Sequence, residues 1–277
     1  MKSKILRKAL RNKSVLIGSA MILIIVFAAV FAPVLTPYDP HVMDHDNPLL
    51  TPSLEHPFGT DQFGRDLLTR IIYGTRISLL VGIVSVVVAM IIGVLTGLVS
   101  GYYGGWVDSL LGRVVDVFLS FPVLLLAIAL VAVIGGGTVS VIIALCAVSW
   151  TKYTRVVRSS VLAIREEEYV LAARTIGARN SRIMFKYILS NALAPIIVVA
   201  TLSIGTAIVS EATLSFLGVG IMPPTVSWGY TLSFGLRYLR AAPHLSIFPG
   251  LAIMFTVLGF NLLGNGIRDI TDPRLVV

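Results

Sequence analysis

Long apolar runs alternate with polar connections along the chain, and these runs have the length of membrane-spanning helices. Five of them approach or exceed about 20 residues, the length that crosses the hydrocarbon core of a bilayer. They cover residues 15–35, 77–99, 114–134, 193–216 and 245–263. A sixth run, 138–150, is shorter. It is either a buried or re-entrant segment or the first part of a helix that continues through Tyr153 and Val157.

The distribution of basic residues favours six crossings. Lys and Arg are enriched in loops on the cytoplasmic side of a membrane. With six crossings, the basic N-terminal segment, the segment 151–191 and the C-terminal segment lie on the same side, and they hold most of the 22 Lys and Arg residues. The sequence therefore predicts an all-α, polytopic integral membrane protein with six transmembrane helices and cytoplasmic N and C termini. Residues 1–76 would hold the tail, the first helix and a long outer loop, and residues 77–277 a five-helix core.

Two local patterns lie around the second apolar run. Leu67, Leu68, Ile71 and Ile72 share one face of a helix, which predicts a short helix on the outer membrane surface before the second span. Within the span, Gly93, Gly97 and Gly101 recur at every fourth residue. Small residues at this spacing allow two helices to approach closely, although glycine is also simply tolerated in membrane helices.

Composition agrees with the membrane assignment. The chain has 277 residues, of which 56% are hydrophobic and 13% are charged, and its mean hydropathy is +0.90. Soluble domains carry about 25% charged residues, so a soluble surface is excluded and membrane lipid is the expected surrounding. The net charge of +8 follows from orientation in the bilayer, and we expect no nucleic acid partner.

Motifs for chemistry within the chain are absent from the sequence. There is no P-loop, no H-E-x-x-H and no paired C-x-x-C, so we expect no catalytic, cofactor-binding or metal-binding residues. His41, Asp44, His45 and Asp46 are close in sequence and have metal-binding side chains, but a solvated acidic loop is the favoured explanation. Glu211 is the clearest charge within an apolar run, and its insertion cost predicts that it faces protein or water.

A polar segment at about 151–192 separates the fourth and fifth spans. It predicts a helix over 166–176 that ends at Gly177, and a second helix, capped by Asn180 or Ser181, that runs to residue 191 before Pro195 begins the fifth span. Ala172, Ala173, Ile176 and Gly177 are neighbours on one side of the first helix. This pattern is typical of a cytoplasmic docking helix, and equally of an amphipathic helix on the inner membrane surface.

This segment resembles the cytoplasmic loop of permease subunits in ATP-binding-cassette importers, whose pattern is E-A-A, three residues, G, and then I-x-L-P. The corresponding residues are Leu171-Ala172-Ala173, Gly177 and Ile188-Leu189-Ser190, with Leu171 in place of the glutamate and Ser190 in place of the proline. The resemblance implies that the loop is a coupling helix gripped by an ATPase subunit. The implied contact residues are Leu171, Ala172, Ala173, Arg174, Ile176, Gly177, Ala178 and Arg179.

Three further stretches are similar to the dipeptide, oligopeptide and nickel branch of these importers, and to its second permease, the C component. They are 56–82 in the outer loop, 211–229 after the fifth span, and 260–274 at the C-terminus. The resemblance implies partners: a second homologous permease, two ATPase subunits that hold the ATP and Mg, and an external substrate-binding protein. Di- or oligopeptides are the expected substrates. The alternatives are nickel, a nickel chelate or glutathione and, from another class, a proton-coupled carrier or a membrane enzyme.

Overall fold

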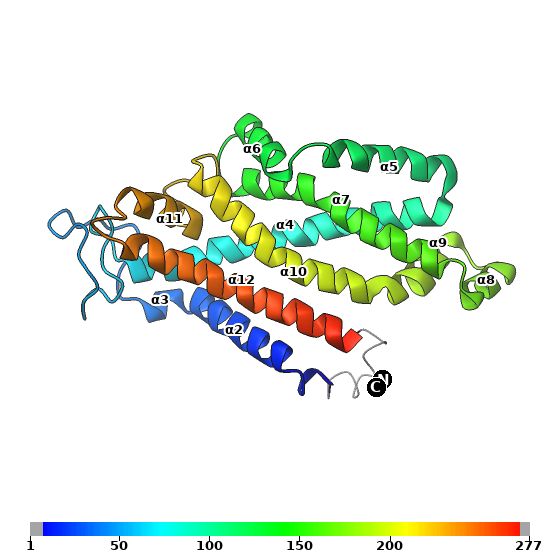
Figure 1. Ribbon diagram of the computed structural model, residues 1–277, viewed down its shortest axis with the longest axis horizontal. Helices are drawn as coiled ribbons and strands as arrows, with labels where there is room; N and C mark the ends of the chain where they lie inside the picture. Colours follow the sequence, from blue (N-terminus) through cyan, green and yellow to red (C-terminus); the bar gives the residue numbers. More distant parts are fainter. Residues whose placement is uncertain (1–7, 272–277) are drawn as a thin grey trace.

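The computed structural model describes residues 8–271, and within that range it consists of helices, loops and one isolated β-bridge between Thr60 and Asp66. Figure 1 shows an elongated bundle in which the longest helices run along the long axis. The all-α prediction is confirmed. In chain order the helices are α2 (Lys13–Val30), α3 (Ala32–Leu35), α4 (Leu67–Tyr103), α5 (Gly105–Leu119), α6 (Val123–Ile134), α7 (Thr138–Ile164), α8 (Glu168–Thr175), α9 (Asn180–Arg182), the π-helix η1 (Ile183–Ile188), α10 (Leu189–Phe216), α11 (Trp228–Arg237) and α12 (His244–Thr271).

Five helical stretches among the described residues are long and apolar enough to cross a membrane, and the pair α5 and α6 makes a sixth if it counts as one span. The predicted third span over 114–134 is not one straight helix. It is divided between α5 and α6, which meet at an angle of 85°. Pro122 is the N-cap of α6. A proline disfavours helical backbone at the residue before it, so the helix stops at Leu119 and a new one begins at Val123.

The second span begins earlier than the apolar pattern predicted. The expected surface helix does not exist as a separate element, because α4 runs without interruption from Leu67 to Tyr103. Its N-cap Asp66 accepts hydrogen bonds from the Thr69 amide at 2.8 Å and the Thr69 hydroxyl at 2.7 Å. Leu67 and Ile71 are buried in a cluster with Trp228 and Leu245. The apolar face that predicted contact with the membrane surface therefore packs inside the protein.

The fourth span is the long alternative considered from the sequence, since α7 continues from Thr138 through Tyr153 and Val157 to Ile164. It packs against α4 along the row of glycines. A Cβ atom on Gly97 would lie 2.7 Å from the carbonyl oxygen of Thr154, and one on Gly101 would lie 2.7 Å from Cβ of Val161. The glycines are therefore sites of close helix approach.

The second cytoplasmic helix is not a separate element either. The stretch α9, η1 and α10 forms one continuous rod over Asn180–Phe216, with Pro195 inside it. Arg179 is the N-cap residue and makes no side-chain capping bond. The Asn180 side chain instead accepts a hydrogen bond from the Tyr102 hydroxyl at 2.8 Å. The predicted cap at Asn180 or Ser181 is therefore wrong, because Asn180 is bonded to the end of α4.

Glu211 is fully buried near the end of α10, as expected for a charge within a span. Its carboxylate accepts hydrogen bonds from the Ser215 hydroxyl at 2.9 Å and the Ser78 hydroxyl at 3.3 Å. Ser215 also accepts a bond from the amide of Ile221 at 2.9 Å. This network ties the loop after α10 to α4.

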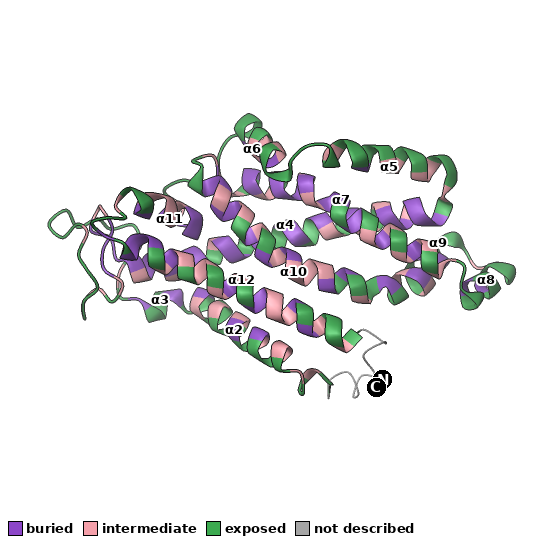
Figure 2. Cartoon of the chain, in the orientation of Figure 1, coloured by how far each residue is buried: buried purple, intermediate pink, exposed green. Residues whose placement is uncertain are grey.

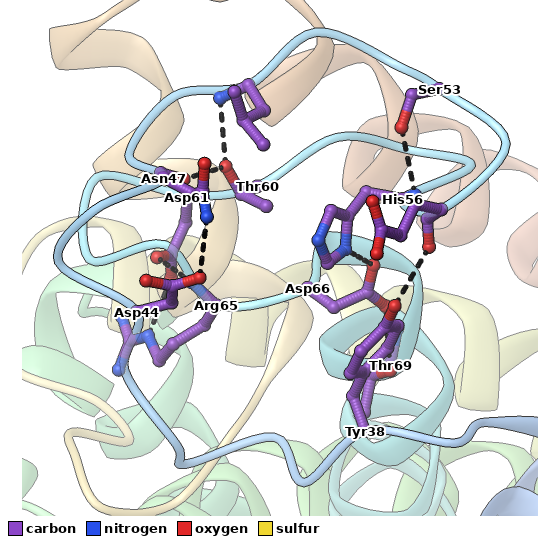
Figure 3. A network of polar contacts seen from close by, with 12 residues as sticks. Tyr38, Asp44, Asn47, Ser53, His56, Thr60, Asp61, Arg65, Asp66 and Thr69 are labelled. Carbon is purple, nitrogen blue, oxygen red and sulfur yellow. Dashed lines mark hydrogen bonds and ion pairs between the residues drawn. The ribbon is translucent and has the colours of Figure 1, made fainter.

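The outer loop between α3 and α4 is ordered by ion pairs and short hydrogen bonds (Figure 3). The Asp61 carboxylate lies 2.7 Å from Nε of Arg65, and Nδ1 of His56 lies 2.9 Å from Oδ1 of Asp66. Asp44 accepts a bond from the Asn47 side chain at 2.9 Å, and this bond lowers the pKa of the Asp44 carboxyl. Among the described residues, no three His, Cys, Asp or Glu side chains converge as a metal site.

The two ends of the bundle differ. The outer loop and α11 lie at one end, whereas α8, the start of α2 and the end of α12 lie toward the other (Figure 1). Figure 2 shows that α5, α6 and much of α8 are exposed. Lys2, Lys4, Arg7 and Arg274, which contributed to the predicted orientation, lie outside the described residues.

Candidate functional site

The candidate site is the loop that α8 forms at one tip of the bundle (Figure 1). The helix has Glu168 in its first turn and Arg174 in its last. The negative charge therefore lies at the positive end of the helix dipole and the positive charge at its negative end, and both interactions are favourable. Glu167 precedes it as the N-cap in extended conformation. The predicted helix over 166–176 is confirmed with slightly tighter bounds, Glu168–Thr175.

The end of α8 is a Schellman motif around Gly177. The amide of Ala178 donates to the carbonyl of Ala173 at 3.0 Å, and the amide of Gly177 donates to the carbonyl of Arg174 at 3.0 Å. These two bonds satisfy carbonyls that a helix end leaves free. Gly177 has a φ of +80°, a conformation that costs L-residues with a Cβ atom roughly 1–2 kcal/mol. The prediction that glycine stops this helix is confirmed.

One face of α8 packs against the bundle and the other is free. Val170 and Ala173 are buried, and Val170 joins a cluster with Val161, Ile183 and Ile188. This corrects the expectation that Ala173 shares the outward side with Ala172, Ile176 and Gly177. Ala173 is three residues after Val170, on the same face of the helix, so its small side chain serves packing within the chain.

The remaining predicted residues are accessible. Leu171, Ala172, Arg174, Ile176, Gly177 and Arg179 are exposed, and Ala178 is half-buried. Ile176 has 83% of its surface exposed, so its aliphatic side chain is available for contact with another protein. The structure thus brings six of the eight predicted residues to the surface of one loop.

The loop is anchored to two neighbouring helices by contacts that the sequence did not reveal. Arg165 donates to the carbonyl of Gly101 at 2.9 Å, and the Arg174 guanidinium lies 5.6 Å from the centroid of the Tyr102 ring. The Tyr169 hydroxyl accepts a bond from the Asn191 side chain at 3.0 Å. Desolvation, together with the charge of Glu167, raises the pKa of Tyr169, so its phenol remains neutral at physiological pH. These contacts join α8 to the ends of α4 and α10.

A groove of about 460 Å³ runs beside the C-terminal end of α8. Its lining adds Tyr187, which the sequence analysis did not single out, to Ile176, Gly177, Ala178, Arg179, Ser181 and Arg182. Arg174, Arg179 and Arg182 form no ion pair with any described residue. The groove is therefore a cationic hollow with an apolar residue, Ile176, at its edge. Such a site can receive a protruding segment of another protein.

Comparison with known proteins identifies the family. Residues 93–277 match the model described as binding-protein-dependent transport system inner membrane component, and this match covers more than half of the chain. The chain belongs to this family. Residues 3–52 match a second model, the N-terminal TM domain of oligopeptide transport permease C. The chain is thus a multi-pass membrane permease of the ATP-binding-cassette importers, in agreement with the resemblance seen in its sequence.

Individual relatives cover almost the whole chain. The dipeptide transport system permease protein DppC of Alkalihalophilus pseudofirmus is 47% identical over 265 residues, which are 96% of this chain and 87% of the relative. The glutathione transport system permease protein GsiD of Shigella flexneri is 44% identical over 270 residues, 97% of this chain and 89% of the relative. These relatives are transport permeases rather than enzymes.

The fold has a counterpart among solved structures. A structure of the methionine ABC transporter MetNI in inward-facing conformations matches with a TM-score of 0.60 and 20% identity. The match covers 74% of this chain and 98% of the matched chain. It shows that the helical arrangement is that of an ABC transporter permease.

Proposed function

We propose that the chain is the C-type permease subunit of an ATP-driven, binding-protein-dependent importer of di- or oligopeptides. The observation that carries the proposal is the 47% identity to a dipeptide permease over 96% of the chain. The family is binding-protein-dependent by its description, which supports an external substrate-binding protein as a partner. A second homologous permease and two ATPase subunits complete the proposed importer, in which ATP and Mg are held by the ATPases.

The exposed loop around α8 is the proposed contact with one ATPase subunit. The free residues of α8 and the groove beside it offer an accessible surface. The anchoring bonds to α4 and α10 would carry a push on α8 into two long helices. In this arrangement α8 lies in the cytoplasm with both termini, and the outer loop faces the substrate-binding protein.

Glutathione is the second candidate substrate, because the GsiD relative is 44% identical over nearly the same length. Glutathione is itself a peptide with free carboxylates, so both candidates share the same recognisable chemistry.

The test is uptake in cells from which this chain has been deleted, with labelled dialanine, labelled glutathione and nickel offered side by side. The proposal predicts that deletion abolishes dialanine uptake and that the intact chain restores it. Loss of glutathione uptake alone would replace the first candidate by the second. Loss of nickel uptake alone, or no loss at all, would contradict both peptide assignments.

A further inference from the structure

A cleft of about 340 Å³ lies between α7 and α10, with residues of α4, α5 and α6 also in its wall. This volume is in the range of small-molecule sites, roughly 300–1,000 Å³. Part of the wall is apolar, including Val86, Leu145 and Val148. The floor along α10 is polar, because Ser203, Thr206 and Ser210 follow one another at intervals of three and four residues and share one helix face. The cleft is far along the bundle from the groove beside α8.

Lys152 lies in this cleft, near the middle of the bundle. Its ammonium donates a hydrogen bond to the Ser203 hydroxyl at 3.0 Å. Ser203 lies at the centre of α10. At a rise of 1.5 Å per residue it is about 20 Å from either end of that helix. The sequence left open whether a helix continues past residue 150, and α7 does continue, through Lys152 to Ile164.

The charge of Lys152 has no counter-ion among the described residues, since none of the ion pairs there includes it. An ammonium group has three N–H donors, and Ser203 takes one. Tyr153 also lines the cleft, but its hydroxyl is fully buried beside Ser203 and is not open to a substrate. The Thr206 and Ser210 hydroxyls donate within α10, to the carbonyls of Ser203 and Thr206 at 2.8 and 2.9 Å, so toward the cleft they are acceptors. The cleft therefore offers a cation, hydroxyl acceptors and an apolar wall.

Contact with lipid is unfavourable for the face of α7 that carries Lys152. A lysine within the hydrocarbon core costs about 2.5–3.5 kcal/mol even on insertion scales, and such residues face the bundle interior or a water-filled cavity and mark substrate pathways. Arg155 and Ser159 are exposed on the same helix, so the polar face continues beyond Lys152 toward α8. A water-filled passage satisfies these groups, and a lipid chain does not.

From this we infer that Lys152 binds a carboxylate of the substrate during its passage, with the hydroxyl oxygens of Ser203, Thr206 and Ser210 as acceptors for N–H groups of the substrate beside it. The inference rests on the proposed function, because every peptide with a free C-terminus carries such a carboxylate. Beyond the proposed function, the inference names Lys152 as a substrate-binding residue. It also requires the translocated molecule to be an anion or a zwitterion when it passes this cleft. The apolar wall then faces its side chains without selecting among them.

The experiment uses the complete importer in proteoliposomes with its binding protein and labelled dialanine. Lys152→Gln removes the charge at nearly constant length, Lys152→Arg keeps the charge, and Lys13→Gln removes an exposed lysine from the start of α2 as a matched control. We expect dialanine uptake to fall about tenfold in Lys152→Gln, as for the loss of one charged hydrogen bond. Uptake should stay within about threefold of wild type in Lys152→Arg and be unchanged in Lys13→Gln. Recovery of the second permease should be unchanged in all three, and basal ATP hydrolysis should be unchanged in the control Lys13→Gln.

Dialanine amide, which lacks the carboxylate, separates substrate recognition from assembly. Wild type and Lys152→Gln should import it at the same rate. Unchanged dialanine uptake in Lys152→Gln would overturn the inference. So would loss of the second permease from that complex, because Lys152 would then pair with a carboxylate of the partner. Failure of the wild-type importer to move dialanine would overturn the proposed function and the inference with it, and is distinguished by appearing before any substitution is made.

Discussion

At the scale of single residues, Gly177 is the position where sequence and conformation are most tightly linked. Its φ of +80° closes the Schellman motif, and a Cβ atom placed there would meet nothing within 4 Å. The requirement for glycine is therefore conformational and does not come from lack of space within this chain. A substitution tests the shape of the loop without creating a clash inside the permease.

Gly177→Val should lower peptide uptake about tenfold while the protein remains inserted in the membrane. A β-branched residue in the left-handed region costs roughly 1–2 kcal/mol and would redirect the chain after α8. Gly177→Asn is the matched control, because asparagine tolerates this conformation, and it should keep at least half of the uptake. Both are measured as initial rates at equal membrane abundance. Equal rates for Val and Asn would show that the loop conformation is not needed for coupling.

At the scale of elements, the contact between α4 and α7 depends on small residues. Gly93, Gly97 and Gly101 lie against α7, and its backbone carbonyl groups are near enough that no side chain fits at Gly97. In contrast, Gly250 on α12 has open space around it. The two positions therefore allow a comparison in which only the packing differs.

Gly97→Leu should destabilise the permease, since overpacking typically costs about 1–3 kcal/mol. We expect a lower melting temperature of the purified complex and reduced abundance in the membrane. Gly250→Leu should leave both near the wild-type values. Equal melting temperatures for the two variants would contradict the packing seen between α4 and α7.

Element boundaries were predictable where apolar runs end in polar residues and were missed where they do not. The coupling loop follows from local signals, namely a short helix with charges at each end and Gly177 after it. The continuous α4 was missed because Leu67 and Ile71 are covered by Trp228 and Leu245, which are distant in the sequence. A pattern of residues cannot distinguish an apolar face that meets lipid from one that meets protein.

The buried side of α8 was missed for the same reason, namely that its packing partners are not adjacent in the sequence. Ala173 was placed with its exposed neighbours, although it lies on the face of α8 that carries Val170, which packs with Ile183 and Ile188 of the following rod. The extent of the fourth span was left open because hydropathy falls after residue 150, although the helix itself continues to Ile164. The break before Pro122 was readable from the proline, but the angle of 85° depends on packing and was not.

At the scale of the whole molecule, the bundle has one end with α8 and another with the ordered outer loop (Figure 1). The predicted orientation assigns the α8 end to the cytoplasm. Leu54 in the outer loop and Ile176 beside α8 are both highly exposed, so they are suitable reporters for the two ends. The single native cysteine, Cys146, is buried.

Labelling with a membrane-impermeant maleimide should distinguish the two ends in intact cells. Leu54→Cys should react before the cells are opened, and Ile176→Cys only afterwards, because the reagent does not cross the membrane. The unsubstituted chain gives the background from Cys146. Rapid labelling of Ile176→Cys in intact cells would reverse the proposed topology.

The central claim is that the loop around α8 is the surface on which an ATPase subunit acts. It is tested most directly by site-specific crosslinking in the assembled importer, with a short thiol-to-amine reagent on Ile176→Cys and, as a control of equal exposure at the other end, Val34→Cys. We predict a covalent product between Ile176→Cys and an ATPase subunit, and none between Val34→Cys and that subunit. If the importer assembles and Ile176→Cys yields no product with an ATPase subunit, the assignment of this loop is contradicted.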